Sequence, residues 1–196
     1  SAGIAAVADA FKALADDDGI RAVVLTGAGP KAFFGGADIN ELNGLNADSG
    51  RAFITALHDL FVLIRELPVP VIARVNGFCL GAGMEMAAAC DLRVASDNAV
   101  FGMPEVRVGI PSVIEAALLP RLVGWGRSNY LVLTAQNINA ATAYEWGFLE
   151  SVAPAASLDA EIDRIASAIA ASGPRAVRSQ KALVRQWERL PLEDGI

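Results

Sequence analysis

Apolar side chains recur at helical spacing in several segments of this chain. Within residues 2–16, Ile4, Val7, Phe11 and Leu14 fall on one face of a helix, and this three-to-four-residue period predicts an amphipathic helix. The same kind of pattern predicts helices over residues 51–67, 113–123, 128–134, 140–146, 158–171 and 174–190. The last of these carries proline in its first turn, a position that favours a helix start.

Between the predicted helices lie short runs that are apolar without alternation. They predict β-strands over residues 21–26, 71–75, 92–96, 99–102 and 148–152. Because such strands are apolar on both faces, their alternation with helices predicts an α/β fold with a covered parallel sheet. Residues 27–36 are expected to form a glycine-rich loop, residues 46–50 a mobile surface loop, and residues 105–111 irregular structure. No internal repeat or linker-like boundary interrupts the pattern, so we expect a single domain over residues 1–196.

Composition narrows the class of protein. The chain has 196 residues, of which 54% are hydrophobic, and this is enough for one sizeable core. The net charge of -6, without any run of lysine and arginine, argues against a nucleic-acid partner. Every stretch of 18 residues contains a charge, so we expect no membrane-spanning helix.

Cysteine and histidine are too few to build a metal centre or a histidine-based triad. Cys79 and Cys90 fit no metal-ligand spacing, and we expect them to be buried free thiols in a reducing cytoplasm. His58 is the only histidine of the chain. We therefore expect no metal site, and any acid–base chemistry must come from other side chains.

The stretch from Asn76 to Asp91 carries the first chemical signal. It opens with the turn dipeptide Asn-Gly, passes through Gly81, Ala82 and Gly83, and continues into helix-forming methionine and alanine. Glu85 is the only charged residue between Phe78 and Cys90, so it is a candidate for burial, which costs several kcal/mol unless the carboxylate is bonded or neutralised. A helix that begins near Ala82 would also direct free backbone N–H groups at an anion. This combination suits acyl chemistry.

A second glycine-rich segment follows the first predicted strand. Residues 27–32 match the dinucleotide pattern G-x-G-x-x-A, but Pro30 and the sequence Phe33-Phe34-Gly35-Gly36 do not continue as the helix that this motif requires. The segment is more typical of a turn that directs a backbone N–H, such as that of Ala37, into a pocket. If this donor and that of Ala82 converge, they form an oxyanion hole.

Glu105 is a second candidate acid. It follows an apolar run that ends in the rigid Pro104. Two carboxyl groups in apolar surroundings can divide the roles of general acid and general base, because their environments push their pKa values apart. A third acid, Glu115, also lies in an apolar segment, but at a predicted helix start, where acids are favoured in any case.

These features together resemble the crotonase superfamily, the enoyl-CoA hydratases and isomerases. The resemblance is carried, in order along the chain, by IRAVVLTGAGPKAFFGGADI (20–39), VPVIARVNGFCLGAGMEMAAACDLRVAS (69–96), FGMPEVRVGIP (101–111) and LPRLVGWGRSNYLVLTAQNINAATAYEWGFLESV (119–152). It implies a crotonase-like spiral of β-β-α units that assembles as a homotrimer or a dimer of trimers. It also implies an acyl-CoA thioester as the substrate, with CoA as part of that substrate and no separate cofactor.

The resemblance also implies roles for individual residues. The backbone N–H groups of Ala37 and Ala82 would hold the thioester carbonyl, Glu85 would activate the water, and Glu105 would deliver the proton at C2. Residues around these groups would contact the substrate: Lys31, Phe34, Gly36, Asp38, Ile39, Gly81, Gly83 and Pro104. The presence of both acids favours a hydratase.

Three departures from the family pattern keep alternatives open. The chain is expected to lack the strand and loop that precede the first helix in relatives, and also their last helices. After Pro111 it has SVIEAALLP, where many hydratases have a glycine-rich run, so Ser112 and Glu115 are unusual there. The alternatives are a Δ3-Δ2 enoyl-CoA isomerase or thioester hydrolase, or a non-catalytic acyl-CoA binder.

Overall fold

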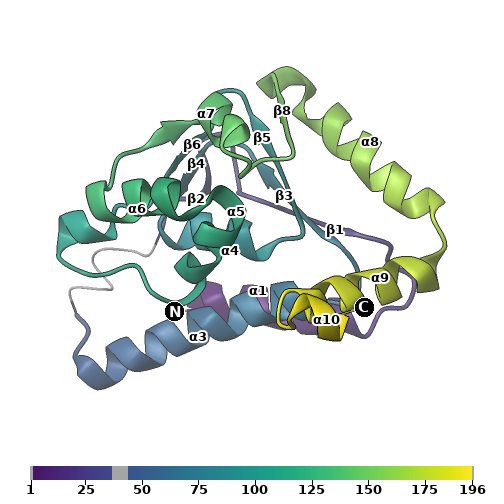
Figure 1. Ribbon diagram of the computed structural model, residues 1–196, viewed down its shortest axis with the longest axis horizontal. Helices are drawn as coiled ribbons and strands as arrows, with labels where there is room; N and C mark the ends of the chain where they lie inside the picture. The colour runs from purple at the N-terminus through teal and green to yellow at the C-terminus, as the bar shows by residue number, and fades with distance from the viewer. Residues whose placement is uncertain (1, 37–43, 196) are drawn as a thin grey trace.

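The computed structural model describes residues 2–36 and 44–195 of the chain (Figure 1). Its longer helices are α1 (Ala2–Ala15), α3 (Ala47–Glu66), α8 (Leu158–Ala171) and α9 (Pro174–Trp187). The shorter ones are α4 (Ala82–Ala89), α5 (Leu119–Val123), α6 (Trp125–Thr134), α7 (Ala140–Glu145) and α10 (Leu192–Gly195). The described residues also form three 3₁₀ turns: η1 (Glu105–Val108), η2 (Ile114–Leu118) and η3 (Ala155–Ser157).

The strands form two sheets, and β1 to β6 alternate between them along the chain. One sheet has the order β1 (Val23–Thr26), β3 (Val71–Val75), β5 (Leu92–Ser96) and β8 (Ser151–Ala153), and all its pairs are parallel. The other has the order β2 (Ala32–Phe34), β4 (Phe78–Leu80), β6 (Val100–Gly102) and β7 (Ile138–Asn139). Its last pair, β6 with β7, is antiparallel. The chain thus repeats strand, strand, helix, which is the β-β-α spiral that the family resemblance implies.

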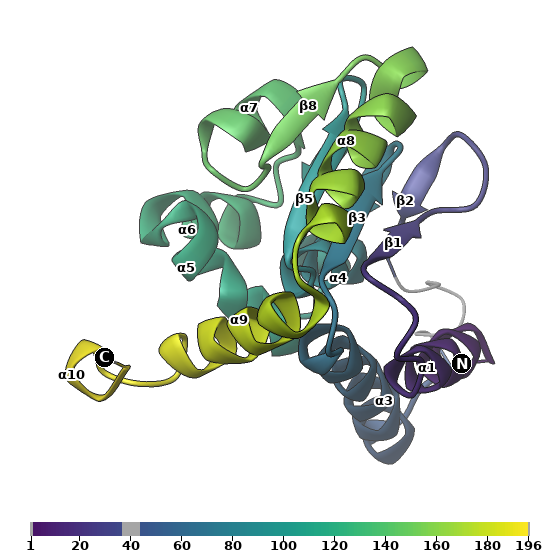
Figure 2. The same ribbon diagram turned by 90° about the vertical axis from the view of Figure 1, so that its right-hand side faces the viewer.

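Helices cover the first sheet in the way that its apolar strands require. On one face, α8 lies across β3 and β5 (Figure 2), where Leu158 and Ile162 pack against Ile72 and Val94. The main core gathers residues from α1, α3, α4 and the strands, and its fully buried members include Phe61, Met84 and Phe101. The prediction of a covered α/β sheet is confirmed, with β7 as an antiparallel addition.

The sequence pattern places several elements correctly and misses three short strands. The predicted bounds of β3, β5 and α8 match the structure. Strands β2 and β4 lie in segments predicted as loop and turn, and β7 was not predicted. Each has two or three residues, which is too short for an apolar period to show. The helix predicted over residues 128–134 begins earlier than expected, because α6 starts at Trp125.

The predicted mobile loop at residues 46–50 is wrong: it is the start of α3. The Asn46 side chain accepts hydrogen bonds from the N–H groups of Asp48 and Ser49, at 3.0 and 2.9 Å. The Ser49 hydroxyl in turn accepts from the Asn46 N–H at 2.9 Å, which completes a capping box. Polar residues that are typical of loops here satisfy the free donors of a helix end.

We expect Asn46→Ala to lower the free energy of unfolding by about 1 kcal/mol, because it removes both acceptor bonds of this cap. Asn46→Asp keeps an acceptor oxygen in place and should change stability much less. Urea denaturation of the three proteins measures the difference. Equal stability of the alanine and aspartate variants would show that the cap does not anchor α3.

Candidate active site

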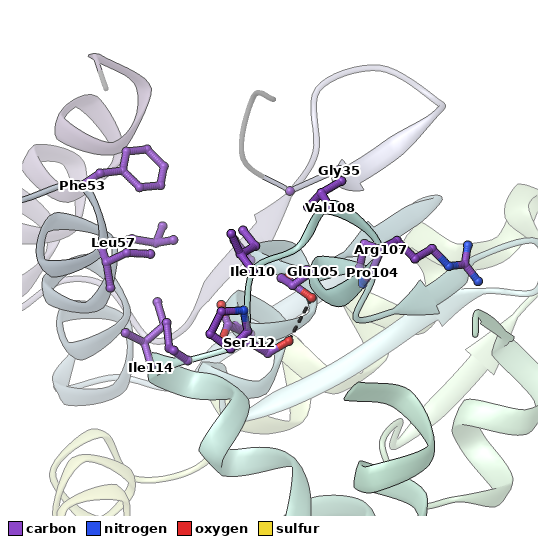
Figure 3. A pocket seen from close by; sticks show the side chains of 17 residues that line it. Gly35, Phe53, Leu57, Pro104, Glu105, Arg107, Val108, Ile110, Ser112 and Ile114 are labelled. Atoms are coloured by element: carbon purple, nitrogen blue, oxygen red, sulfur yellow. Dashed lines mark hydrogen bonds between the residues drawn. The ribbon is translucent and has the colours of Figure 1, made fainter. Parts of the chain in front are cut away.

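A cavity of about 290 Å³ opens between α3, the β4–α4 turn and the segment that runs from β6 to η2 (Figure 3). It brings together four separate stretches of the sequence. Its lining residues are Gly35, Gly36, Phe53, Ile54, Leu57, Gly81, Ala82, Glu85, Pro104, Glu105, Arg107, Val108, Ile110, Pro111, Ser112, Val113 and Ile114. Both acids singled out from the sequence therefore face one cavity.

The turn between β4 and α4 brings backbone to the cavity wall. Gly81 has φ +54°, a left-handed conformation that favours glycine, and a side chain there would overlap the carboxylate of Glu105. Its N–H donates to the Gly102 carbonyl at 2.9 Å, which ties the turn to β6. Ala82 follows as the first residue of α4, a position whose N–H has no acceptor within the helix. This turn can therefore present a backbone donor to a bound anion or carbonyl oxygen.

Helix α4 is fixed at its far end by ionic contacts. Asp91, just after the helix, accepts from the Val71 N–H at 2.7 Å. It also pairs with Lys181 and Arg185 of α9, at 2.7 and 2.6 Å. These contacts hold the helix that carries Glu85 against both the sheet and α9.

Glu85 is a buried acid, as its sequence context predicts. Only 4% of the residue is exposed, and burial raises its pKa from 4.5 to about 8. The negative charges of Glu105 and Glu115 raise the pKa further, while a hydrogen bond that Oε1 accepts from the Ala116 N–H at 2.8 Å lowers it. At neutral pH Glu85 therefore keeps its proton.

Glu105 begins the η1 turn directly after β6 and lies closer to solvent than Glu85. Its Oε2 accepts a hydrogen bond from the Ser112 hydroxyl at 3.0 Å, and Figure 3 shows this bond at the centre of the cavity. Ser112, which departs from the glycine-rich family pattern, thus orients the second acid. The two carboxyl groups have different partners and different burial, which is the condition for separate acid and base roles.

The two glycine-containing loops meet at this cavity. Gly35 and Gly36 lie on its wall beside Gly81 and Ala82. Buried Gly83 packs against the Phe34 carbonyl so closely that a side chain at this position would overlap it. The end of β2 is therefore in direct contact with the first turn of α4. Ala37, Asp38 and Ile39, which the sequence assigned to the oxyanion hole and to substrate contacts, lie outside the described residues.

The remaining predicted contact residues occupy different places. Pro104 joins Gly36 and Gly81 on the cavity wall. Lys31 is exposed and Phe34 is half-buried, and neither belongs to the cavity lining. Gly83 contributes through packing behind the wall.

Sequence reasoning did not identify the apolar wall of the cavity. Phe53 and Leu57 point into it from α3, opposite Glu105, while the side chain of Arg107 is directed away (Figure 3). Their helical spacing indicated a buried face but not that the face borders a cavity. Ile114 completes this wall with φ +41°, a left-handed conformation that costs a branched residue about 1–3 kcal/mol.

The cysteines are buried and free, as predicted. Burial raises the pKa of Cys90 to about 12 and that of Cys79 well above its usual value, so both remain thiols. Among residues 2–36 and 44–195, no cluster of three potential metal-binding side chains occurs. In the same part of the chain, no helix combines the length and apolarity needed to cross a bilayer.

The raised pKa of Glu85 predicts how stability depends on pH. Above about pH 5 the unfolded chain ionises this carboxyl while the native protein keeps it neutral, so stability falls until the pH passes the native value near 8. The loss is about 1.4 kcal/mol for each pH unit in this window. Glu85→Gln has no carboxyl group to titrate and so lacks this pH-dependent loss of stability. The variant should therefore become more stable relative to the native chain as the pH rises.

Urea denaturation at about pH 5 and pH 8 measures this difference. Asp163→Asn, which removes an exposed carboxylate on α8, is the matched control and should follow the native chain. Parallel pH dependences for Glu85→Gln and the native chain would contradict a buried neutral Glu85.

Comparison with known proteins places this geometry in a family. A family model described as enoyl-CoA hydratase/isomerase matches residues 2–196. The chain is 41% identical over 181 residues to the crotonyl-CoA hydratase of Syntrophomonas wolfei, and 42% identical over 182 residues to the short-chain-enoyl-CoA hydratase of Clostridium acetobutylicum. Each match covers 92% of this chain and 70% of the relative.

The fold matches solved structures of the same kind. The crystal structure of an enoyl-CoA hydratase from Bacillus anthracis superposes with a TM-score of 0.95 at 35% identity, covering 99% of this chain and 76% of that one. Sequence and fold thus agree. The chain belongs to the enoyl-CoA hydratase/isomerase family, within the crotonase superfamily.

Proposed function

We propose that this chain is an enoyl-CoA hydratase, which adds water across the C2=C3 double bond of a 2-enoyl-CoA thioester. The observation that carries the proposal is the placement of Glu85 and Glu105 on one cavity with an apolar opposite wall. The relatives named as crotonyl-CoA and short-chain-enoyl-CoA hydratases support the same reaction. A hydration moves only water and protons, so the reaction needs no metal or redox cofactor.

The thioester carbonyl binds at the β4–α4 turn. There it accepts a hydrogen bond from the Ala82 N–H, and we assign the second donor to Ala37. As water attacks C3, negative charge develops on this oxygen, and fixed backbone donors stabilise it without reorganisation. The apolar wall of Phe53, Leu57 and Ile114 receives the acyl chain. Exposed Lys31 is available to the CoA phosphates.

Between them, the two acids carry one proton. It is on Glu105 before hydration and on Glu85 after it. In hydration, Glu85 accepts a proton from the water as its oxygen bonds to C3, and Glu105 gives its proton to C2. The site is then left with the proton on Glu85, the state that burial favours. From that state the reverse reaction can begin directly, with Glu85 protonating the departing hydroxyl and Glu105 removing the C2 proton. A further hydration requires the proton to pass back to Glu105.

We further propose that the chain works as a homotrimer or a dimer of trimers in the cytoplasm. Large exposed apolar side chains support an assembly: Trp125, Leu133 and Leu192 are each more than two-thirds exposed. Buried reduced cysteines fit the reducing compartment.

We expect the purified protein to consume crotonyl-CoA, which is followed as loss of the conjugated thioester absorbance. Glu105→Gln and Glu85→Gln should each lower kcat by about 10²–10⁴, because each removes a proton-transfer group. Glu145→Gln, on the exposed face of α7, is the matched control and should retain full activity. A Glu105→Gln variant with unchanged turnover would contradict the proposal.

Product analysis in deuterated water distinguishes hydration from the sister reactions. A hydratase forms a 3-hydroxyacyl-CoA, an isomerase moves the double bond without adding water, and a hydrolase releases free CoA. We expect the 3-hydroxyacyl product. A folded protein that binds CoA without turnover would support the non-catalytic binder instead.

A further inference from the structure

Glu115 is a buried acid that the reaction above does not use. Only 7% of the residue is exposed. Its Oε1 lies 2.9 Å from Nδ1 of His58, the only histidine of the chain, which projects from α3. Its Oε2 is buried without a hydrogen-bond partner among the described residues. Burying a carboxyl oxygen without a hydrogen-bond partner costs free energy, so the position of Glu115 needs an explanation.

The backbone of the same turn holds Glu85. Ala116 follows Glu115 directly, and its N–H donates to Oε1 of Glu85 at 2.8 Å. That N–H also lies 3.1 Å from the Val113 carbonyl, so its direction depends on the shape of the turn. Ile114, on the other side of Glu115, has the strained left-handed backbone and lines the cavity. One residue therefore separates the donor to the buried acid from the cavity wall.

The contact with His58 links this turn to α3. The η2 turn packs against both α3 and α4, and α3 also supplies Phe53 and Leu57 to the cavity. A turn with a strained residue keeps its conformation only if its surroundings hold it. The hydrogen bond between His58 and Glu115 is a side-chain contact that can do so, and it ties the strained segment to a 20-residue helix.

We propose that His58 and Glu115 are a positioning pair for Glu85: their contact holds the η2 turn so that the Ala116 N–H stays on Glu85 and Ile114 stays on the cavity wall. Neither residue touches the substrate. The inference deepens the proposed hydratase function, on which its kinetic part rests. It gives a role to Glu115, an acid in the segment that departs from the glycine-rich pattern of many hydratases.

The charge of Glu115 gives the pair a second effect. Burial raises the pKa of Glu115, and His58 and Arg65, both on α3, lower it. From α4, Glu85 faces it, and the negative charge of Glu115 raises the pKa of Glu85. On α5, Arg121 bonds instead to the Glu188 carbonyl, without contact to this group. Loss of the Glu115 charge should therefore lower the pKa of Glu85.

The first test measures the stability of the η2 turn and needs no substrate. Hydrogen exchange of the Ala116 amide, followed by NMR, reports whether its bond to Glu85 persists. We expect His58→Ala to speed this exchange by about tenfold relative to other amides of η2 and α5. His58→Asn, whose amide nitrogen can occupy the place of Nδ1, should restore it. Glu150→Gln, which alters the ion pair with Arg93, is the matched control and should leave this amide unchanged.

The second test is kinetic. His58→Ala should lower kcat for crotonyl-CoA by about tenfold, His58→Asn should recover most of it, and Glu150→Gln should leave it unchanged. Glu115→Gln keeps the shape of the side chain and removes its charge. It should move the acidic limb of the kcat/KM profile to lower pH by about half a unit or more, which a purely structural role would not do.

The outcomes separate this inference from the proposed function. If the native protein hydrates crotonyl-CoA but His58→Ala leaves both Ala116 exchange and kcat within about twofold, the positioning pair is wrong and the function stands. If the native protein shows no hydration but His58→Ala loosens Ala116, the pair stands and the function is wrong. Should His58→Ala fail to fold, Glu115→Ala, which removes the other partner of the contact, decides: exchange of the Ala116 amide within about twofold of the native protein overturns the proposal.

Discussion

The burial of one carboxyl group, that of Glu85, is the constraint on which the rest of the site depends. Every residue of α4 is buried, so the acid has little water to stabilise its charge. It remains there because the Ala116 N–H bonds to one oxygen and because, at neutral pH, the native protein keeps it protonated. A protonated acid beside the less buried Glu105 gives a cavity with one mobile proton and two places for it. This is the arrangement that reversible addition of water requires.

The fold supports that constraint through backbone contacts more than through side chains. Gly81 adopts the left-handed conformation that favours glycine, and its N–H bonds to the Gly102 carbonyl of β6. Gly83 packs so closely on the backbone at the end of β2 that a side chain there would overlap it. At the other end of α4, Asp91 joins the helix to β3 and α9. The alternation of strands between two sheets brings these ends together, because each β-β-α unit delivers its turn to the same edge. The acid is thus fixed by the architecture before any ligand arrives.

The sequence predicted the parts of this site that depend on local pattern. Glu85 stands as the only charge in an apolar helix, and its burial followed from that context. The convergence of the two glycine loops could be stated only as a condition, because the contact of β2 with β4 links residues that are distant along the chain. These two strands, with three residues each, show no apolar period.

Contacts between residues that are distant in the sequence could not be predicted from the pattern of apolar and polar positions. Asn46 and Ser49 looked like loop residues because the same side chains favour loops and helix caps. His58 appeared chemically idle as a lone histidine, since its partner Glu115 lies 57 positions away. The cavity wall from α3 likewise looked like ordinary core. In each case the residue type was visible in the sequence, but its partner was set by the tertiary fold.

The most direct test of this account is a titration of glutamate carboxyl groups by carbon-13 NMR in the substrate-free protein, with Glu85→Gln to assign the signal. The account predicts one carboxyl with a midpoint near pH 8 that is absent from the variant. It would be contradicted if the signal lost in Glu85→Gln titrated at about 4–5, as a solvated glutamate does. Glu85 would then be charged in the resting cavity, and its burial could not supply the shared proton.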